Sequence, residues 1–90
     1  MNNVVEKKLV GRIAHYFSKI GVAVIELSAD LKVGDTIRIE GATTAFEQLV
    51  DSIEIEKQKL EVATAGQAIG LKVKEKVRPS DSVYKLTRAE

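Results

Sequence analysis

Apolar residues in this chain recur mainly at every second position, and this spacing constrains the possible folds more than any other feature. The run Thr36-Ile37-Arg38-Ile39-Glu40 alternates strictly, and the stretch Val22–Leu27 is rich in β-branched side chains. Alternation at period two sends successive side chains to opposite faces of a β-strand. The sequence therefore predicts an all-β protein in which Ile37 and Ile39 face the interior.

Glycines and polar turn residues divide the chain into six or seven expected strands. Gly21 indicates a hairpin, and Gly34-Asp35 indicates a tight turn, because glycine accepts a positive φ. Gly66 and Gly70 are expected to allow a turn and a close backbone approach. The alternation changes phase near residues 51–52, which predicts a bulge or a bend there. A helix over residues 45–60 is the alternative, since part of that stretch also fits helical spacing. The expected strands span residues 9–17, 22–27, 36–40, 46–55, 60–62, 68–77 and 81–86.

Chain length and composition set the scale of the fold. The chain has 90 residues, of which 44% are hydrophobic and 30% are charged, as in one globular domain. A domain of this size buries a modest core, and closing the sheet would remove its open edges. We therefore expect a small closed antiparallel β-barrel of six to seven strands. It would form a single domain over residues 1–90, with a core at residues 8–87 and no internal repeat.

Several functional classes are excluded or disfavoured by residue types. The chain has no cysteine, which excludes disulfides, thiolate catalysis and cysteine-based zinc sites. Residues 1–9 are charged rather than apolar, and no apolar run reaches the ~18 residues of a membrane span. We expect a soluble, cytoplasmic protein with no membrane partner. High charge with few Asn and Gln is also typical of thermophile proteins.

No catalytic constellation is expected. The single histidine, His15, shares its strand parity with Ile13 and Phe17, so a partly buried structural residue is expected. No serine lies in a Gly-x-Ser-x-Gly motif. The acidic stretch at residues 51–56 indicates a solvated strand face rather than an acid–base pair. The sequence predicts neither an enzyme, nor a metal site, nor a cofactor.

Basic residues give the best candidate site. Formal net charge is +1, but it divides into +3 over residues 1–20, −4 over residues 21–60 and +2 over residues 61–90. If the ends meet in space, they form a basic face that could follow phosphates. An outward solvated face, or an edge that resists aggregation, is the alternative. The candidate nucleic-acid-binding residues are Lys8, Arg12, Tyr16, Lys72, Lys74, Lys76 and Arg78.

The roles expected of these residues follow from strand parity. Period two places Lys72, Lys74 and Lys76 on one side of the strand at residues 68–77. Lys8 and Arg12 would extend the patch if the first strand lies near the sixth. Tyr16 shares the parity of Lys8 and Arg12 and could stack on a base.

Five blocks occur in an order that resembles the second, β-barrel domain of translational GTPases such as elongation factor Tu and bacterial initiation factor two. The resemblance covers about residues 8–77 and implies a barrel of that type. No Gly-x-x-x-x-Gly-Lys-Ser/Thr loop is present, so GTP binding is not implied. At the position of the second Gly-Asp turn of that family, this chain has Ser80-Asp81. The blocks are Val10-Gly11-Arg12-Ile13, Gly21-Val22-Ala23-Val24, residues 31–39, residues 52–55 and residues 62–71.

Two further stretches, residues 43–52 and 77–85, are similar to the small C-terminal barrel of collagenase-type bacterial and archaeal peptidases. That barrel is itself similar to the elongation-factor domain. The resemblances imply a non-catalytic, stand-alone, translation-related module that binds RNA or a ribonucleoprotein such as the ribosome. The alternative is a protein-interaction module that docks on a separately encoded enzyme or self-associates. Exposed Val22 and Val24 and a free barrel edge would provide its surface.

Overall fold

Ten β-strands and their connecting turns build the part of the chain that the computed structural model describes, residues 4–89, with side chains described for residues 5–87. The all-β prediction is confirmed, and the helix alternative at residues 45–60 is wrong. Residues 1–3 and 90 of the expected domain lie outside the described residues. The strands are β1 (Val4–Phe17), β2 (Val22–Leu27), β3 (Leu31–Lys32), β4 (Thr36–Glu40), β5 (Ala45–Leu49), β6 (Ile53–Ile55), β7 (Gln58–Leu60), β8 (Val62–Ala63), β9 (Ala68–Lys72) and β10 (Ser82–Ala89).

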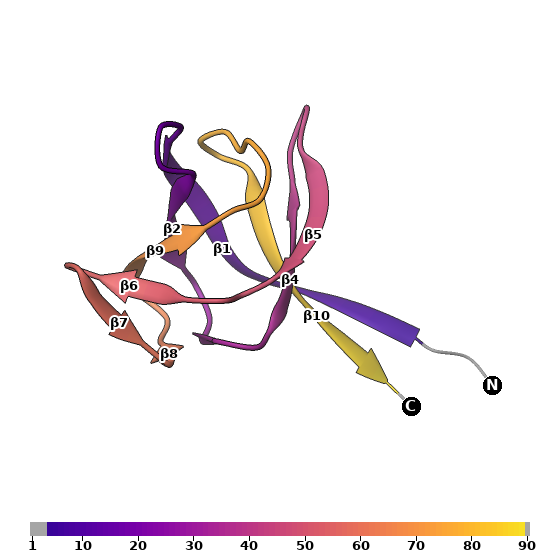
Figure 1. Ribbon diagram of the computed structural model, residues 1–90. Coiled ribbons are helices and arrows are strands. Elements are labelled where there is room, and N and C mark those ends of the chain that lie inside the picture. Colours follow the sequence, from indigo (N-terminus) through magenta and orange to yellow (C-terminus); the bar gives the residue numbers. More distant parts are fainter. Residues whose placement is uncertain (1–3, 90) are drawn as a thin grey trace.

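Eight of these strands form one curved antiparallel sheet in the order β5-β4-β10-β1-β2-β9-β6-β7, and β3 pairs with β8 in a second small sheet (Figure 1). The two end strands, β5 and β7, do not pair with each other, so the sheet is open and the expected closed barrel is not confirmed. The physical reason is that β6 pairs with β9 only at Glu54 and Gly70, and β9 then ends at Lys72, so no backbone ladder joins this end of the sheet to β5. The Gln48 amide bridges this gap instead of a backbone ladder.

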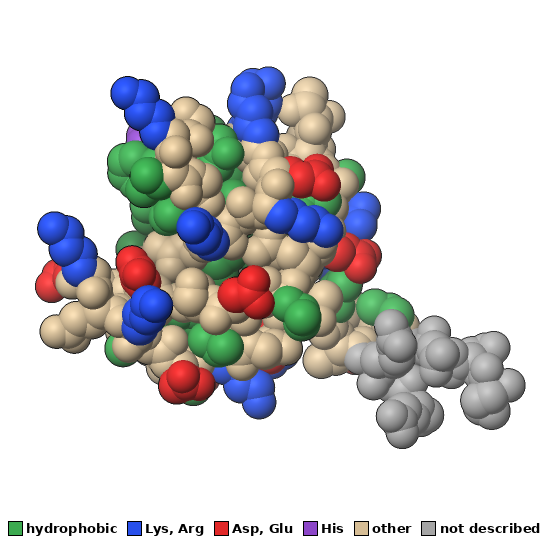
Figure 2. Space-filling model, viewed as in Figure 1, with side chains coloured by type: hydrophobic (Ala, Val, Ile, Leu, Met, Phe, Trp, Pro, Cys, Tyr) green, Lys and Arg blue, Asp and Glu red, His purple; other side chains and the backbone are tan. Residues whose placement is uncertain are grey.

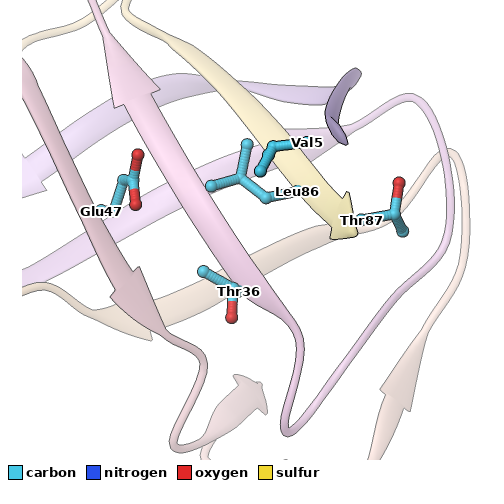
Figure 3. Close-up of a pocket in the computed structure, with 5 residues that line it drawn as sticks. All are labelled: Val5, Thr36, Glu47, Leu86 and Thr87. Carbon is cyan, nitrogen blue, oxygen red and sulfur yellow. The ribbon is translucent and has the colours of Figure 1, made fainter. Parts of the chain in front are cut away.

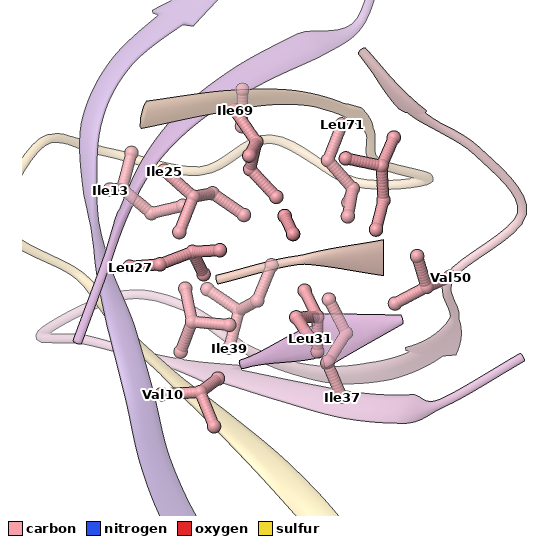
Figure 4. Close-up of a cluster of buried hydrophobic side chains, with 14 of the residues drawn as sticks. Val10, Ile13, Ile25, Leu27, Leu31, Ile37, Ile39, Val50, Ile69 and Leu71 are labelled. Atoms are coloured by element: carbon pink, nitrogen blue, oxygen red, sulfur yellow. The ribbon is translucent and has the colours of Figure 1, made fainter. Parts of the chain in front are cut away.

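The core lies inside the curve of the sheet, where side chains from both halves meet (Figure 4). The expected alternation is observed: Ile37 and Ile39 are both fully buried, while Thr36, Arg38 and Glu40 are only half-buried. Burying each large apolar side chain contributes about 1.5–3 kcal/mol. The fully buried large side chains are Ile13, Ile25, Leu31, Ile37, Ile39, Ile53, Ile69, Leu71, Val10, Val50, Val77 and Val83.

Several strands differ from the expected ranges. The expected strand at residues 46–55 is two strands, β5 and β6, and the phase change is the bend between them. Val50 is buried at this bend, and it exchanges backbone hydrogen bonds with the turn at Gly34 and Asp35. The expected strand at residues 60–62 corresponds to two strands, β7 and β8. No strand was expected at the position of β3. At this bend the chain leaves β5, at one end of the sheet, and enters β6, near the other end. The bend therefore explains the phase change.

Glycine allows the expected turns at Gly21 and Gly34, but Gly70 does not have its expected role. Gly21 and Gly34 adopt φ values of 66° and 98°, which confirms the predicted hairpin and the turn before β4. Gly70 was expected to allow a close backbone approach. A Cβ there would lie 3.6 Å from the Val22 Cγ1 atom, which is an ordinary contact, so this expectation is wrong. Among residues 4–89 no helix is long and apolar enough to cross a membrane.

Candidate interaction surface

The basic residues expected on the first strand do not form a common face. Lys8 is exposed, lies opposite Lys85 in the ladder between β1 and β10, and lines a hollow of about 490 Å³. Arg12 is exposed on β1, and its guanidinium donates to the Glu26 carboxylate at 3.3 Å. Arg12 therefore already has an acidic partner within the chain.

Two register shifts in β1 explain why strand parity failed there. The ladder to β10 shifts between Leu9 and Gly11, and the ladder to β2 shifts between Ile13 and His15. Each extra residue reverses the faces of the strand beyond it. Tyr16 is therefore half-buried and packs against the core instead of sharing an outer face with Arg12. His15 is exposed instead of partly buried, and its ring lies edge-on to Phe17 at 4.4 Å.

The lysines expected on one strand face are divided between a strand and a loop. Lys72 is the last residue of β9, whereas Lys74, Lys76 and Arg78 lie in the segment that leads to β10. All four are exposed. Strand β2 separates β1 from β9, so the two expected halves of the patch are not neighbours. Figure 2 shows one face of the molecule on which Lys and Arg side chains are scattered between acidic and neutral ones.

The outer face of β5, β4, β10 and β1 carries a charge network that is balanced within the chain. Lys7 lies 3.0 Å from the Glu40 carboxylate and 4.5 Å from the centre of the Tyr84 ring. Arg38 donates to Glu40 and, at 3.2 Å, to Glu47. The hydrogen bonds from Arg38 and then Lys7 lower the pKa of Glu40, and the hydrogen bond to Glu40 raises the pKa of Arg38.

A shallow hollow of about 330 Å³ lies on this same outer face (Figure 3). Val5 and Leu86 form its apolar side, and Thr36 and Glu47 line it from β4 and β5. Val5 is 49% exposed. The hollow is small and borders on residues whose charges are already paired.

A larger hollow, of about 570 Å³, lies where the β1–β2 hairpin approaches β5 and the end of β9. We call it the Ile20–Leu49 hollow, after the apolar residues on its rim. Ile20 is 61% exposed and Leu49 is 57% exposed, and the half-buried Val73 lies between them in the wall. Its charged rim consists of Lys72, Lys74 and Asp51.

Three hydrogen bonds hold the walls of the Ile20–Leu49 hollow together. The Val73 amide donates to the Gly21 carbonyl at 3.0 Å, which joins the hairpin to the segment after β9. The Gln48 side chain donates to the Lys72 carbonyl and accepts from the Lys74 amide, both at 2.8 Å. The hollow is therefore built before any partner arrives.

Sequence reasoning missed this hollow, although two signals for it were present. Ile20 is an apolar residue in a hairpin turn, and Leu49 falls on the outward parity of its strand. Val22 and Val24, which were expected to be exposed, are half-buried. The described residues contain no group of three or more His, Asp and Glu side chains placed to hold a metal ion.

Comparison with known proteins gives this geometry a context. No protein-family model matches the chain. A collagenase of Porphyromonas gingivalis is 47% identical over 87 residues, which cover 94% of this chain and 24% of that protein. An uncharacterized protease of Methanocaldococcus jannaschii is 44% identical over 78 residues, covering 86% of this chain and 19% of that protein. The chain thus spans a quarter or less of the length of these relatives.

Solved structures identify the fold. The crystal structure of the C-terminal domain of a Geobacillus thermoleovorans protein described as a U32 peptidase superimposes with a TM-score of 0.82. It covers 87% of this chain and 91% of that domain, at 23% sequence identity. The selenomethionine variant of the same domain gives a TM-score of 0.81.

These findings correct the expected function. The relatives are named collagenase and protease, and the structural neighbours are peptidase C-terminal domains, so the translation-related, RNA-binding interpretation is wrong. The expected similarity to the C-terminal barrel of collagenase-type peptidases is confirmed. None of the findings confirms the resemblance to the translation factors. The chain is similar to a segment of collagenase-type proteases, and it has the fold of a U32 peptidase C-terminal domain.

Proposed function

We propose that this chain is a non-catalytic accessory domain of a collagenase-type peptidase, and that it acts by docking on the catalytic part. One observation carries the proposal: identity of 47% extends over 94% of this chain but over only 24% of the P. gingivalis collagenase. The matched segment is thus a module within a much larger protein.

The solved neighbours support an accessory role. A domain of this fold has been crystallised apart from the rest of its peptidase, which shows that such a domain folds without a catalytic part. The side chains of the present chain fit a binding module as well. Its single histidine lies edge-on to Phe17 at the surface, and its buried carboxylates, Asp35 and Asp81, accept hydrogen bonds from turn amides.

A segment exchange tests the proposal. The 87-residue matched segment of the P. gingivalis collagenase is replaced with this chain, and gelatin hydrolysis by the chimera is compared with that of the native protein. A variant with the segment deleted shows how much activity depends on the module. We expect the chimera to hydrolyse gelatin at a rate close to the native rate, and the deletion variant to lose activity.

The isolated chain completes the experiment. Assayed alone, it should not hydrolyse gelatin. Hydrolysis by the isolated chain would contradict a non-catalytic role. An inactive chimera beside a fully active deletion variant would contradict the role as an accessory domain of such a peptidase.

A further inference from the structure

We infer that the Ile20–Leu49 hollow is the face through which this domain docks, and that it receives an apolar side chain flanked by carboxylates on the catalytic part of a collagenase-type peptidase. The inference rests on the proposed function and specifies the surface that it uses.

The exposed apolar side chains of the domain are most prominent at this hollow. Ile20 and Leu49 are the two most exposed large apolar side chains in the described part of the chain, at 61% and 57%. Ile20 comes from the β1–β2 turn and Leu49 from the end of β5, and both line one hollow together with Val73. Exposed apolar groups that converge around a concavity are typical of interaction sites, whereas scattered ones are not.

The hollow is already ordered. The Val73 amide donates to the Gly21 carbonyl, and the Gln48 side-chain amide bonds the Lys72 carbonyl at the end of β9 and the Lys74 amide after it. A partner that fills the hollow therefore does not have to order its walls. Less conformational entropy is lost on binding when the site is preformed.

The rim of the hollow carries unpaired positive charge. Lys72 and Lys74 are exposed on the rim, and within residues 5–87 neither forms an ion pair. Asp51 is the one carboxylate on the same rim. On the outer face of β4 and β10, by contrast, Glu40 already pairs with both Lys7 and Arg38. Two unpaired lysines beside an apolar hollow favour a partner that presents carboxylates.

The relatives of the chain indicate which partner occupies the hollow. The matched segment makes up 24% of the P. gingivalis relative, so in that protein a domain like this one is covalently joined to a much larger part. Tethering raises the effective concentration of the two parts, so a modest apolar contact is sufficient for docking. The catalytic part is therefore the partner to which we assign the hollow.

The test uses the chimera described above and hydrogen–deuterium exchange. Exchange is measured for the peptides that cover residues 19–21 and 49–51, in the isolated chain and in the chimera. We expect exchange in these peptides to slow by about tenfold in the chimera, because docking excludes water from the hollow. Added salt should reduce the protection, because the lysines contribute to docking.

Matched variants locate the surface. Ile20→Asp and Leu49→Asp should each abolish the protection in the chimera. Val62→Asp on β8 and Val5→Asp on β1 replace side chains that are 53% and 49% exposed elsewhere, and they should preserve it. Thermal unfolding of each variant of the isolated chain shows that the fold is intact, since none of these side chains is buried. The double variant Lys72→Glu with Lys74→Glu should weaken protection without removing an apolar group.

The outcomes separate the two proposals. An active chimera with an unprotected hollow, or one in which Val5→Asp rather than Ile20→Asp releases the domain, would overturn the docking surface alone. Slowed exchange in the isolated chain that rises with concentration, with a dimer in sedimentation equilibrium, would assign the hollow to a second copy and overturn the peptidase as occupant. An inactive chimera beside a fully active deletion variant would overturn the proposed function and this inference together.

Discussion

Ser80 occupies the position in the turn before β10 that Gly34 occupies in the turn before β4. Both residues have a positive φ, of 78° and 98°. Each precedes an aspartate whose carboxylate accepts a backbone amide three residues earlier, at 2.9 Å for Asp81 and 3.0 Å for Asp35. The two turns are thus one structure built twice from different residues.

We predict that Ser80→Gly stabilises the chain by up to about 1 kcal/mol. Left-handed backbone costs a non-glycine residue about 1–2 kcal/mol, and the greater freedom of glycine in the unfolded chain offsets roughly 0.5–1 kcal/mol of that relief. Urea denaturation measures the difference. The reciprocal variant Gly34→Ser should lose a similar amount, and a Ser80→Gly protein that is less stable than the native one would contradict the prediction.

The carboxylate of Asp81 lies against Gly41, in the space that a Cβ atom at position 41 would fill. Gly41→Ala must therefore displace a buried carboxylate that holds the turn before β10, and we expect a loss of about 1–3 kcal/mol in unfolding free energy. Gly70→Ala is the matched control, since its added methyl group would make only ordinary contacts. Equal stability of the two variants in thermal and urea unfolding would show that the contact at Gly41 has no consequence.

The strands could be predicted from the sequence wherever alternation and burial agree. Residues 36–40 alternate between buried and half-buried, and the predicted range matches β4 exactly because one face of that strand is covered. Residues 22–27 match β2 for the same reason. Periodicity is strong evidence for a strand when only one of its faces is buried.

The basic surface could not be predicted in the same way. A single extra residue in a strand cannot be recognised from the composition, but it moves every side chain beyond it to the opposite face of the strand. The shift between Ile13 and His15 turned Tyr16 inward and His15 outward relative to the parity of Arg12 and Ile13. The end of β9 at Lys72 depends on where the chain meets Gln48, far away in the sequence, so local alternation through Lys76 predicted a strand that is too long.

The repeated turn shows another limit. Its pattern consists of backbone hydrogen bonds: Ser80 and Asp81 exchange bonds with Ile13 as Gly34 and Asp35 do with Val50. Only the aspartate is common to the two sequences. Because backbone groups are the same in every residue, such a repeated turn is not visible as a sequence repeat, and only the resemblance to the translational GTPases pointed to Ser80-Asp81 as a second turn.

The ion pairs of Glu40 predict a pH dependence. Hydrogen bonds from Arg38 and then Lys7 hold the pKa of Glu40 below its ordinary value of 4.5. A carboxyl with a lowered pKa in the folded state contributes stability above its unfolded value, and the contribution is lost as pH falls through the folded value. As pH falls through the acid range in which Glu40 becomes protonated, the unfolding free energy of Glu40→Gln should therefore decrease less steeply than that of the native chain.

A control separates this effect from a simple change of charge. Glu61→Gln removes an exposed carboxylate that forms no ion pair among residues 5–87. It should therefore leave the decrease of unfolding free energy with falling pH nearly unchanged. Salt should reduce the difference between Glu40→Gln and the native chain, because exposed pairs are screened. Parallel pH profiles for the native chain and Glu40→Gln would show that the network does not affect folding.

Gln48 gives the last prediction, because its amide spans the gap between β5 and the segment after β9. Gln48→Ala removes the acceptor of the Lys74 amide and the donor to the Lys72 carbonyl, each bond being 2.8 Å long. Both backbone groups can then reach water, so we expect a loss of only about 1–2 kcal/mol. Exchange of the Lys74 amide, followed by NMR, should become faster, because its acceptor is gone. Gln48→Glu keeps the acceptor oxygen and loses the donor, and it should therefore keep most of the Lys74 protection. Slow Lys74 exchange in Gln48→Ala would mean that something other than this side chain closes the gap.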